Sequence, residues 1–330
     1  MKWNIRPIEL ELKFDWKISR NTSTKKTNYV IEVEEGDFKA KGEVAPNIRY
    51  GEDGEKILQE FTQFLKEKPQ KFDSIEELTK FLKSLDISYS LKFGIEAAFV
   101  DYISQISDLT KYRLLGTNSV TQIKTSFSIP IMETEKLADF INEYKLERFD
   151  ELKIKIDKSS VEAVQVILGN YPGKLRLDAN EAFENADEVL AFLAQIDCER
   201  ISFLEQPLKA DNHDEALSLK EKSPVMIFAD ESLTHHEVSQ YYAERFHGVN
   251  IKLMKAGSYF QALKQMRRAK ELGLKTMIGC MVESSLGISQ TFPICQGADY
   301  LDLDGCLLIK NDPFNLVTEE KGRLFFSHLH

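Results

Sequence analysis

The feature that most constrains the fold of this chain is a repeat of strand-like and helix-like segments. From about residue 120 onward, short runs rich in β-branched residues alternate with longer amphipathic stretches rich in Lys and Glu. The candidate strands are residues 121–130, 151–156, 174–180, 200–207, 225–232, 248–254, 275–280 and 300–305. Such alternation is typical of βα units around a parallel sheet. Parallel strands in this number close into a barrel more readily than they form an open sheet, although a doubly wound sheet has the same period.

The part of the chain before about residue 115 follows a different pattern. Apolar residues alternate in residues 8–14 and 28–36, which predicts strands, and helical periodicity follows in residues 55–68 and 74–85. We interpret this part as a separate α+β domain that covers one end of the barrel, with residues 111–120 as the junction.

Composition limits the functional classes. Hydrophobic residues make up 42% and charged residues 29% of the 330 positions, which is ordinary for a soluble globular protein. The 53 acidic and 43 basic residues give a net charge of -10, and such a field repels nucleic acid and anionic membranes. No apolar run approaches the roughly 20 residues needed to span a bilayer, and the first residues lack the apolar core of a signal peptide. We therefore expect a cytoplasmic protein with neither nucleic acid nor membrane as a partner.

Charged residues recur near the ends of the apolar candidate strands. They are Lys153, Lys155, Asp178, Glu205, Asp230, Lys252, Asp302 and Asp304. The steps from Asp178 to Lys252 are 22 to 27 residues long, which leaves room for one strand, one helix and two short loops. In a parallel barrel the carboxyl ends of the strands form one face, and active sites lie on that face. The position of these charges therefore points to chemistry.

The acidic residues among them suit a hard metal ion. Asp178, Glu205 and Asp230 would offer oxygen ligands from three adjacent strands, and Mg²⁺ prefers oxygen ligands in near-octahedral geometry. No His or Cys stands at these positions, which argues against zinc. Lys153 and Lys155 are two residues apart and share one face of a strand, where carboxylates must balance their charge.

Lysines on both sides of such a metal have a chemical purpose. A metal that binds a substrate carboxylate stabilises the enediolate formed when the α-proton leaves. Lys155 and Lys252, on the second and sixth candidate strands, would face each other across the barrel. One would remove the proton in its neutral form and the other would return a proton to the opposite face, which inverts the stereocentre. A surface salt bridge explains any single one of these charges equally well, but it explains poorly their occurrence on five successive strands.

At these residues the chain resembles the muconate-lactonizing subgroup of the enolase superfamily. The resemblance spans essentially the whole chain and is tightest in ELKIKI, LRLDANEAF, FLEQPL, FADESL, VNIKLMKAG and MIGCMVESSLGIS. It implies an α/β fold, a modified TIM barrel of the (β/α)7β type with an N-terminal α+β capping domain. The implied divisions are the cap at 1–117, the barrel at 118–310, and a segment at 311–330 that returns to the cap.

The resemblance also implies roles for single residues. The implied ligands of one Mg²⁺ per active site are Asp178, Glu205 and Asp230, and the implied catalytic residues are Lys155, Lys252 and Lys153. Lys153 would hold the substrate carboxylate, and Asn180 and Glu231 would support the metal ligands from behind.

Within the subgroup, the closing DLDG most resembles the dipeptide epimerases of the L-Ala-D/L-Glu type. Asp302 and Asp304 would bind the α-ammonium of the dipeptide, and two carboxylates on one face suit a cation. Muconate and succinylbenzoate-type substrates carry no such cation, so muconate cycloisomerase and o-succinylbenzoate synthase rank second. Met281, Glu283 and Arg20 would contact the substrate. The resemblance also suggests a role in the metabolism of peptidoglycan peptides and leaves open whether the chain forms a homo-oligomer.

Departures and alternatives remain at this stage. The subgroup commonly has KAGG after the sixth strand, whereas this chain has Ser258 at the last position, and the capping loop carries Lys25 and Lys26 as well as Arg20. A lyase or cycloisomerase would need only one of the two lysines. A non-catalytic barrel that binds a metal or a small acid would keep the same charges, and a Schiff-base aldolase would also place a lysine on a barrel strand.

Overall fold

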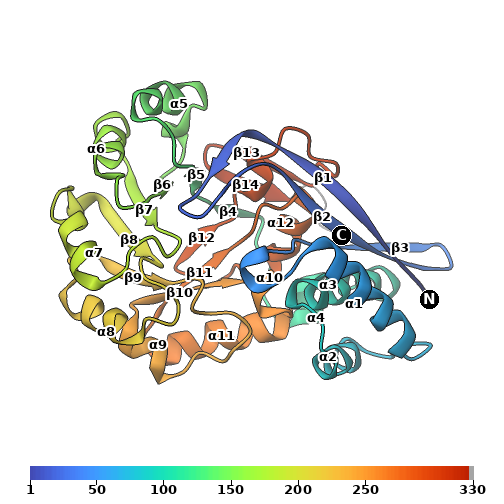
Figure 1. Ribbon diagram of the computed structural model, residues 1–330. Coiled ribbons are helices and arrows are strands. Elements are labelled where there is room, and N and C mark those ends of the chain that lie inside the picture. The colour runs from blue at the N-terminus through green and yellow to red at the C-terminus, as the bar shows by residue number, and fades with distance from the viewer. Residues whose placement is uncertain (327–330) are drawn as a thin grey trace.

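The repeat forms a parallel sheet in the computed structural model, which describes residues 1–326 (Figure 1). Its strands follow one another in sequence order and are β5 (Phe127–Ile129), β6 (Glu151–Lys155), β7 (Lys174–Asp178), β8 (Ile201–Glu205), β9 (Met226–Ala229), β10 (Gly248–Lys252), β11 (Lys275–Gly279) and β12 (Tyr300–Asp302). Every strand pair in this sheet is parallel, as expected when each connection carries a helix.

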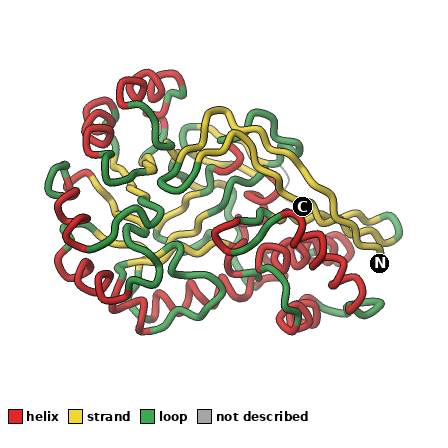
Figure 2. The backbone as a smooth tube through the Cα atoms, in the orientation of Figure 1, coloured by secondary structure: helices red, strands yellow, loops and turns green. Residues whose placement is uncertain are grey.

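Helices connect the strands and lie on the outside of the sheet (Figure 2). They are α5 (Leu137–Glu143), α6 (Val161–Asn170), α7 (Ala186–Leu193), α8 (His213–Lys222), α9 (Gln240–Arg245), α10 (Leu253–Ala256), α11 (Tyr259–Glu271) and α12 (Ser285–Thr291). The connection from β10 to β11 holds two of these helices, and the sheet ends on a strand. The predicted (β/α)7β barrel is thereby confirmed. No helix within residues 1–326 has the length and apolar character needed to cross a bilayer.

Side chains join the first and last strands of the barrel. Ser126 Oγ donates to Asp302 Oδ1 at 2.7 Å, and the Leu303 amide donates to Thr125 Oγ1 at 2.8 Å. The backbone amide of Ser128 donates to Oδ2 of Asp304, two residues after β12, at 2.6 Å. The first and last strands are therefore joined by polar groups around the carboxyl end of β12, where the predicted Asp302 and Asp304 lie.

The opposite end of the barrel interior is filled. Phe203 and Phe228 stack with their ring centroids 4.2 Å apart, and Met277 is buried with them. The guanidinium of Arg176 lies 5.7 Å from the centre of the Phe203 ring and donates to Glu151 at 2.6 Å. Because this end is packed solid, a cavity can open only at the carboxyl ends of the strands.

The cap consists of an antiparallel sheet with helices packed on it, as predicted. Its strands are β1 (Lys2–Lys17), β2 (Thr22–Glu35) and β3 (Phe38–Val44), and its helices are α1 (Gly54–Glu67), α2 (Ile75–Ser84), α3 (Tyr89–Ser107) and α4 (Lys111–Leu115). The alternation in β1 buries Ile8, Leu10 and Leu12 on one face. In Figure 1 the β1–β2 hairpin extends from the cap across the barrel.

Helix α3 was not among the predicted helices, and its burial explains why. Almost all of it is enclosed, so it lacks the polar stripe by which a surface helix is recognised. A Cβ on Gly94 would come within 2.3 Å of Val44, and one on Gly42 within 2.0 Å of the Gly94 carbonyl oxygen. These two glycines therefore let the helix and β3 pack at close range.

Two further findings refine the predicted elements. Residues 121–130 do not form one strand, because β4 (Gln122–Lys124) pairs with β14 (Arg323–Phe326), which in turn pairs with β13 (Val317–Glu320). The departure at Ser258 has a structural role, since its hydroxyl caps α11 and donates to Glu96 of the cap at 2.8 Å.

The predicted divisions at 117 and 310 stay predictions. Segments on both sides of residue 310 contact the cap, since the Lys13 amide donates to the Leu308 carbonyl and the Lys41 ammonium lies 5.6 Å from the Phe314 ring centre. Residues 327–330 of the predicted returning segment lie outside the described residues.

Candidate active site

The strand register places the predicted catalytic and ligand residues in rows. Lys155 pairs with Asp178 in register, and Asp178 pairs with Glu205. On the other side Lys252 is aligned through Gly279 with Asp302. Each is the last residue of its strand, so these side chains all lie at one end of the barrel.

Lys153 lies at the centre of the carboxylates. Its ammonium is 2.7 Å from Glu205 Oε2, 2.8 Å from Asp302 Oδ2 and 3.0 Å from Asp178 Oδ2. Its side chain is 3% exposed. Burial acts to lower the pKa of Lys153, but Asp178, Asp302 and Glu205 outweigh it and raise that pKa well above its ordinary value. Lys153 is therefore a permanent cation in this arrangement.

The two proposed acid/base lysines contact different carboxylates. Lys155 Nζ donates to Asp178 Oδ2 at 2.6 Å, and Lys252 Nζ donates to Asp230 Oδ2 at 3.0 Å. Burial acts to lower the pKa of Lys252, whereas Asp230 raises it with the larger net effect. Burial acts to raise the pKa values of both carboxylates, but Lys153 and Lys155 hold the pKa of Asp178 far below its ordinary range. Lys252 and Lys255 do the same for the pKa of Asp230. Each lysine is thus paired with one candidate metal ligand.

Lys255 is a functional candidate that sequence reasoning missed. Its ammonium donates to Asp230 Oδ1 and to the Asp230 carbonyl oxygen, both at 2.6 Å. Asn250 was missed as well, and its amide donates to Glu205 Oε1 at 2.7 Å. Asn250 lies two residues before Lys252 on β10 and therefore on the same face of the strand, which could have identified it from the sequence. No comparable pattern in the sequence identified Lys255.

The oxygen atoms at this end of the barrel fit a hard cation. Among the residues that the structure describes, Glu205 Oε2 has only the ion-pair contact with Lys153 and receives no hydrogen bond. The buried Asn180 Oδ1 and Glu231 Oε2 likewise lack a donor there. Burial, and next the charge of Asp178, raise the pKa of Glu205 to about 7, so lysines alone do not neutralise the cluster. Within residues 1–326 the carboxylates do not already converge in the manner of a metal centre, because lysine ammonium groups lie between them.

The two predicted ammonium-binding carboxylates differ in their surroundings. Asp302 contacts Lys153 and accepts from Ser126, and these contacts lower its pKa against the effect of burial. Asp304 accepts a backbone hydrogen bond from Ser128, and burial together with the charge of Asp302 raises its pKa to about 7. Asp304 is therefore the carboxylate that gains most from a cationic partner.

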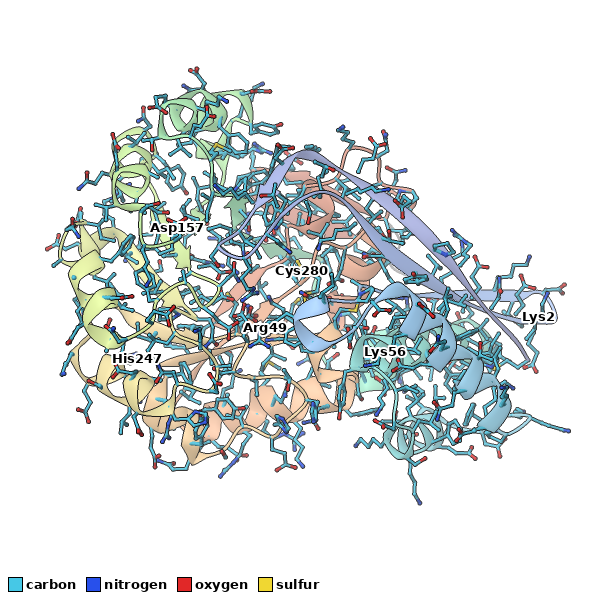
Figure 3. All side chains as sticks on the ribbon, in the orientation of Figure 1. Lys2, Arg49, Lys56, Asp157, His247 and Cys280 are labelled. Atoms are coloured by element: carbon cyan, nitrogen blue, oxygen red, sulfur yellow. The ribbon has the colours of Figure 1, made fainter. Side chains whose placement is uncertain are left out.

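A cavity of about 310 Å³ lies between the barrel end and the cap. Its barrel wall includes Lys153, Lys155, Asn180, Asp230, Glu231, Lys252, Met281, Asp302 and Asp304, and its cap wall includes Trp16, Ile18, Arg20, Lys26 and Arg49. Asp178 and Glu205 lie beneath the lysines and do not line it. Figure 3 labels two lining residues, Arg49 from the cap and Cys280 from the barrel, near the middle of the molecule.

The remaining predicted substrate residues occupy different places. Met281 lines the cavity, and its sulfur lies 3.7 Å from the side-chain amide of Asn47 in the cap. Glu283 is buried behind Met281, whose amide donates to Glu283 Oε1 at 2.8 Å. The structure therefore brings Met281 to the cavity but places Glu283 in the support of its loop.

Arg20 joins the cap to the residues behind the metal ligands. Its guanidinium donates to Glu231 Oε1 at 2.9 Å and to the Asn180 carbonyl oxygen at 2.9 Å. The Asn180 amide nitrogen donates to Asp178 Oδ1 at 3.1 Å, and its side-chain amide donates to Glu231 at 3.2 Å. The predicted supporting residues are thus assembled as a network, and Arg20 takes part in it from the cap.

Comparison with known proteins identifies the family. Residues 123–301 match the family described as Enolase C-terminal domain-like. This chain belongs to that family. A relative in it, the L-Ala-D/L-amino acid epimerase of Pedosphaera parvula, is 35% identical over 97% of this chain and 94% of the relative. The predicted relationship of this chain to the enolase family is confirmed.

Solved structures of relatives have the fold of this enolase-family chain. A substrate-liganded L-Ala-D/L-Glu epimerase from Bacillus subtilis has a TM-score of 0.89 at 23% identity and covers 99% of this chain and 96% of its own. A dipeptide epimerase from Enterococcus faecalis, in complex with Mg and the dipeptide L-Leu-L-Tyr, has a TM-score of 0.86 at 25% identity, with 98% and 96% covered.

Proposed function

We propose that this protein is a dipeptide epimerase that inverts the α-carbon of the C-terminal residue. The observation that carries the proposal is the pair Lys155 and Lys252, which come from strands four apart in the sheet and both line one cavity. Two lysines serve a reaction that removes a proton from one face of a carbon and delivers one to the other. A lyase or cycloisomerase needs only one. The protein is therefore an isomerase that acts on an amino acid derivative.

The carboxylates beneath the lysines support a Mg²⁺-dependent reaction. Asp178, Glu205 and Asp230 would hold the ion, and they offer the oxygen donors that it prefers. When bound there, Mg²⁺ supplies positive charge that stabilises the negative charge left by the departing α-proton and favours neutral lysine amines. The chain itself contributes Lys153, a cation suited to hold the substrate carboxylate, and the two lysines that hold and move the proton.

The dipeptide is favoured over other carboxylate substrates by Asp304. This buried carboxylate lines the cavity beside Asp302 and lacks a cationic partner of its own among the described residues. The α-ammonium of a dipeptide would relieve the repulsion between the two carboxylates, whereas a substrate without a cation would leave it in place. Two curated relatives, from Flavobacteria bacterium and Roseobacter litoralis, are named hydrophobic dipeptide epimerases.

We further propose that the substrate side chain is acidic and contacts Lys26. Arg20 is engaged by barrel carboxylates, but Lys26 lines the cavity and, within residues 1–326, its side-chain ammonium has no hydrogen bond or ion pair. Burial alone lowers its pKa, which marks a cation that has lost water without gaining a partner. An acidic side chain would supply that partner. Roles in peptidoglycan peptide metabolism and a cytoplasmic location stay predictions.

The test is proton exchange followed by NMR. The protein is incubated in D₂O with Mg²⁺ and a panel of L-Ala-L-X dipeptides, with the double variant Lys155→Ala/Lys252→Ala as the control. With one lysine on each face, the epimerised L,D product carries deuterium from the first turnovers, because the lysine that delivers the proton has exchanged with D₂O. If no dipeptide of the panel exchanges its α-proton while metal is bound, the proposal is wrong. Exchange in the L,L substrate without formation of the L,D product would instead favour a one-lysine reaction.

A further inference from the structure

A single carboxylate of the barrel holds two separate segments of the cap. Glu181 lies in the loop after β7, and its side chain is 8% exposed. Arg49 binds it with two parallel hydrogen bonds of 2.8 Å, and Arg20 donates to Glu181 Oε2 at 2.8 Å. The Ala210 amide donates to Glu181 Oε1 at 2.9 Å. Both carboxylate oxygens are therefore fully used, in the paired geometry that gives arginine–carboxylate contacts their strength.

The two arginines belong to the segments that form the cap wall of the cavity. Arg20 lies in the turn between β1 and β2, and Arg49 lies in the short helix Ile48–Tyr50. Residues from both segments line the cavity, and Ile48 itself is 81% exposed there. These segments lie far apart in sequence, and Glu181 joins them to one point of the barrel.

The same contacts extend to the candidate metal ligands. Arg20 also donates to Glu231 and to the carbonyl of Asn180, and the Asn180 amide donates to Asp178. A shift of the cap segments would therefore change the partners of residues that support the reaction centre.

The backbone at this point adopts an uncommon conformation. Asn180 has φ 43° and Glu181 has φ 69°, and both lie in the left-handed region that side-chain-bearing residues rarely occupy. Each such residue costs about 1 kcal/mol or more, and it persists where surrounding contacts hold it. The Glu181 amide donates to the Gln206 carbonyl at 2.8 Å, which fixes this turn and aims the carboxylate at the cap.

We propose that Glu181 is a positioning residue that sets substrate selectivity by holding both cap segments of the cavity wall against the barrel. The proposal deepens the proposed function and rests on it for the kinetic readout alone. Neither arginine would contact the substrate directly. Glu181 would instead keep the cap wall, with Lys26 on the neighbouring strand, at a fixed distance from the lysines of the barrel.

The test compares Glu181→Gln with Glu184→Gln in the full-length protein. Glutamine keeps the size and backbone tolerance of Glu181 but removes the charge that holds both arginines. Glu184 lies three residues further on and is 58% exposed, and its carboxylate forms an ion pair with Lys209 at the surface, so its variant should behave like the wild type. Thermal midpoints of both variants check that the fold is kept.

Two readouts decide the question. For the best dipeptide we expect Glu181→Gln to raise KM about tenfold with kcat within about threefold, and to reduce the ratio of kcat/KM between acidic and apolar side chains. We also expect trypsin to cleave after Arg20 and Arg49 about tenfold faster, because a lost hold of roughly 1.4 kcal/mol raises the open population by that factor.

Unchanged KM, selectivity and trypsin cleavage in Glu181→Gln would overturn the proposal. So would an equal loss of kcat for every dipeptide together with a lower thermal midpoint, since that result indicates a general structural role. If no dipeptide is turned over by the wild type, the proposed function fails, but the cleavage rates after Arg20 and Arg49 still decide whether Glu181 holds the cap.

Discussion

The two walls of the cavity are built in different ways. On the barrel wall, the charged side chains stand at the ends of hydrogen-bonded strands, and most have two or more partners, as Lys153 does with its three carboxylates. On the cap wall, part of the lining comes from the turn between β1 and β2 and from the short helix Ile48–Tyr50, and Glu181 holds these two segments to the barrel. The barrel wall can therefore keep reacting groups in place, whereas the cap wall can change with the substrate.

The two walls should therefore have different roles, the barrel wall in the reaction and the cap wall in the choice of substrate. A change on the barrel wall should affect all substrates alike, because we propose that the proton is moved there. A change on the cap wall should alter which side chain is preferred and leave the reaction intact. The four predictions below test this division, in order of decreasing expected effect.

The largest effect is expected from the lysines of the barrel wall. Lys155→Ala and Lys252→Ala should each lower the rate of epimerisation by about 10³-fold or more, by a similar factor for every dipeptide, because each removes a proposed acid/base group from one face. The measurement is kcat by NMR or polarimetry across the dipeptide panel.

Lys158→Ala is the matched control for the lysine variants, since Lys158 is 47% exposed and pairs with Glu188 on the surface. It should behave like the wild type. The division of roles would be broken if either active-site variant changed the preference among side chains and left the rate with the preferred one intact.

Removal of the metal should be nearly as severe. Dialysis against a chelator should reduce activity by about 100-fold or more, and added Mg²⁺ should restore it, because the substrate carboxylate loses the charge that stabilises its deprotonated form. Mg²⁺ should also raise the unfolding temperature, since an ion that binds only the folded state stabilises it. Full activity in protein shown by elemental analysis to hold no metal would contradict the prediction.

A smaller effect, confined to selectivity, is expected at Lys26 on the cap wall. Lys26→Glu should change the ratio of kcat/KM between acidic and basic side chains by about tenfold or more in favour of basic ones, while kcat with the preferred dipeptide stays within a few-fold. Lys25→Glu is the control, because Lys25 is 67% exposed and pairs with Glu9. An unchanged preference in Lys26→Glu would show that this lysine does not contact the side chain.

The smallest effect is expected where the two walls meet, at Glu283. Burial, and next the charge of Glu43 in the cap, raise its pKa to about 8. Because the folded pKa exceeds the unfolded one, the folded state binds an extra proton between about pH 4.5 and 8, and its stability falls as the pH rises through that window. Glu283→Gln should remove this loss of stability. At pH 8 its free energy of unfolding should exceed that of the wild type by on the order of 2 kcal/mol.

Urea unfolding at pH 5 and pH 8 measures this difference. The Gln side chain keeps the acceptor for the Met281 amide, so the variant and the wild type should differ little at pH 5. If the variant and the wild type differed equally in free energy of unfolding at both pH values, Glu283 would not titrate in this range. Activity should change little in either case, since Glu283 lies behind the cavity wall.

The predictable part of the site is the part carried by strands. Lys155, Asp178, Glu205 and Lys252 end their strands, and the spacing between them follows from one strand and one helix per unit. Charges late in apolar strands were therefore enough to predict their common location. Helix α3 and the divided strand at residues 121–130 were not predictable in this way, because burial on all sides removes periodicity and the pairing of β4 depends on a segment some 200 residues away.

The sequence alone determined the barrel and the end of it at which the predicted catalytic residues lie. Both follow from apolar alternation and strand-end charges, which can be recognised from neighbouring residues along the chain. What only the tertiary structure decided is which charges meet. Lys255 reaches Asp230, and Glu181 binds Arg20 and Arg49, across loops whose separation in sequence places no limit on their distance in space. The partners of a buried charge are set by packing and by the cost of leaving it unpaired, and both act only once the chain is folded.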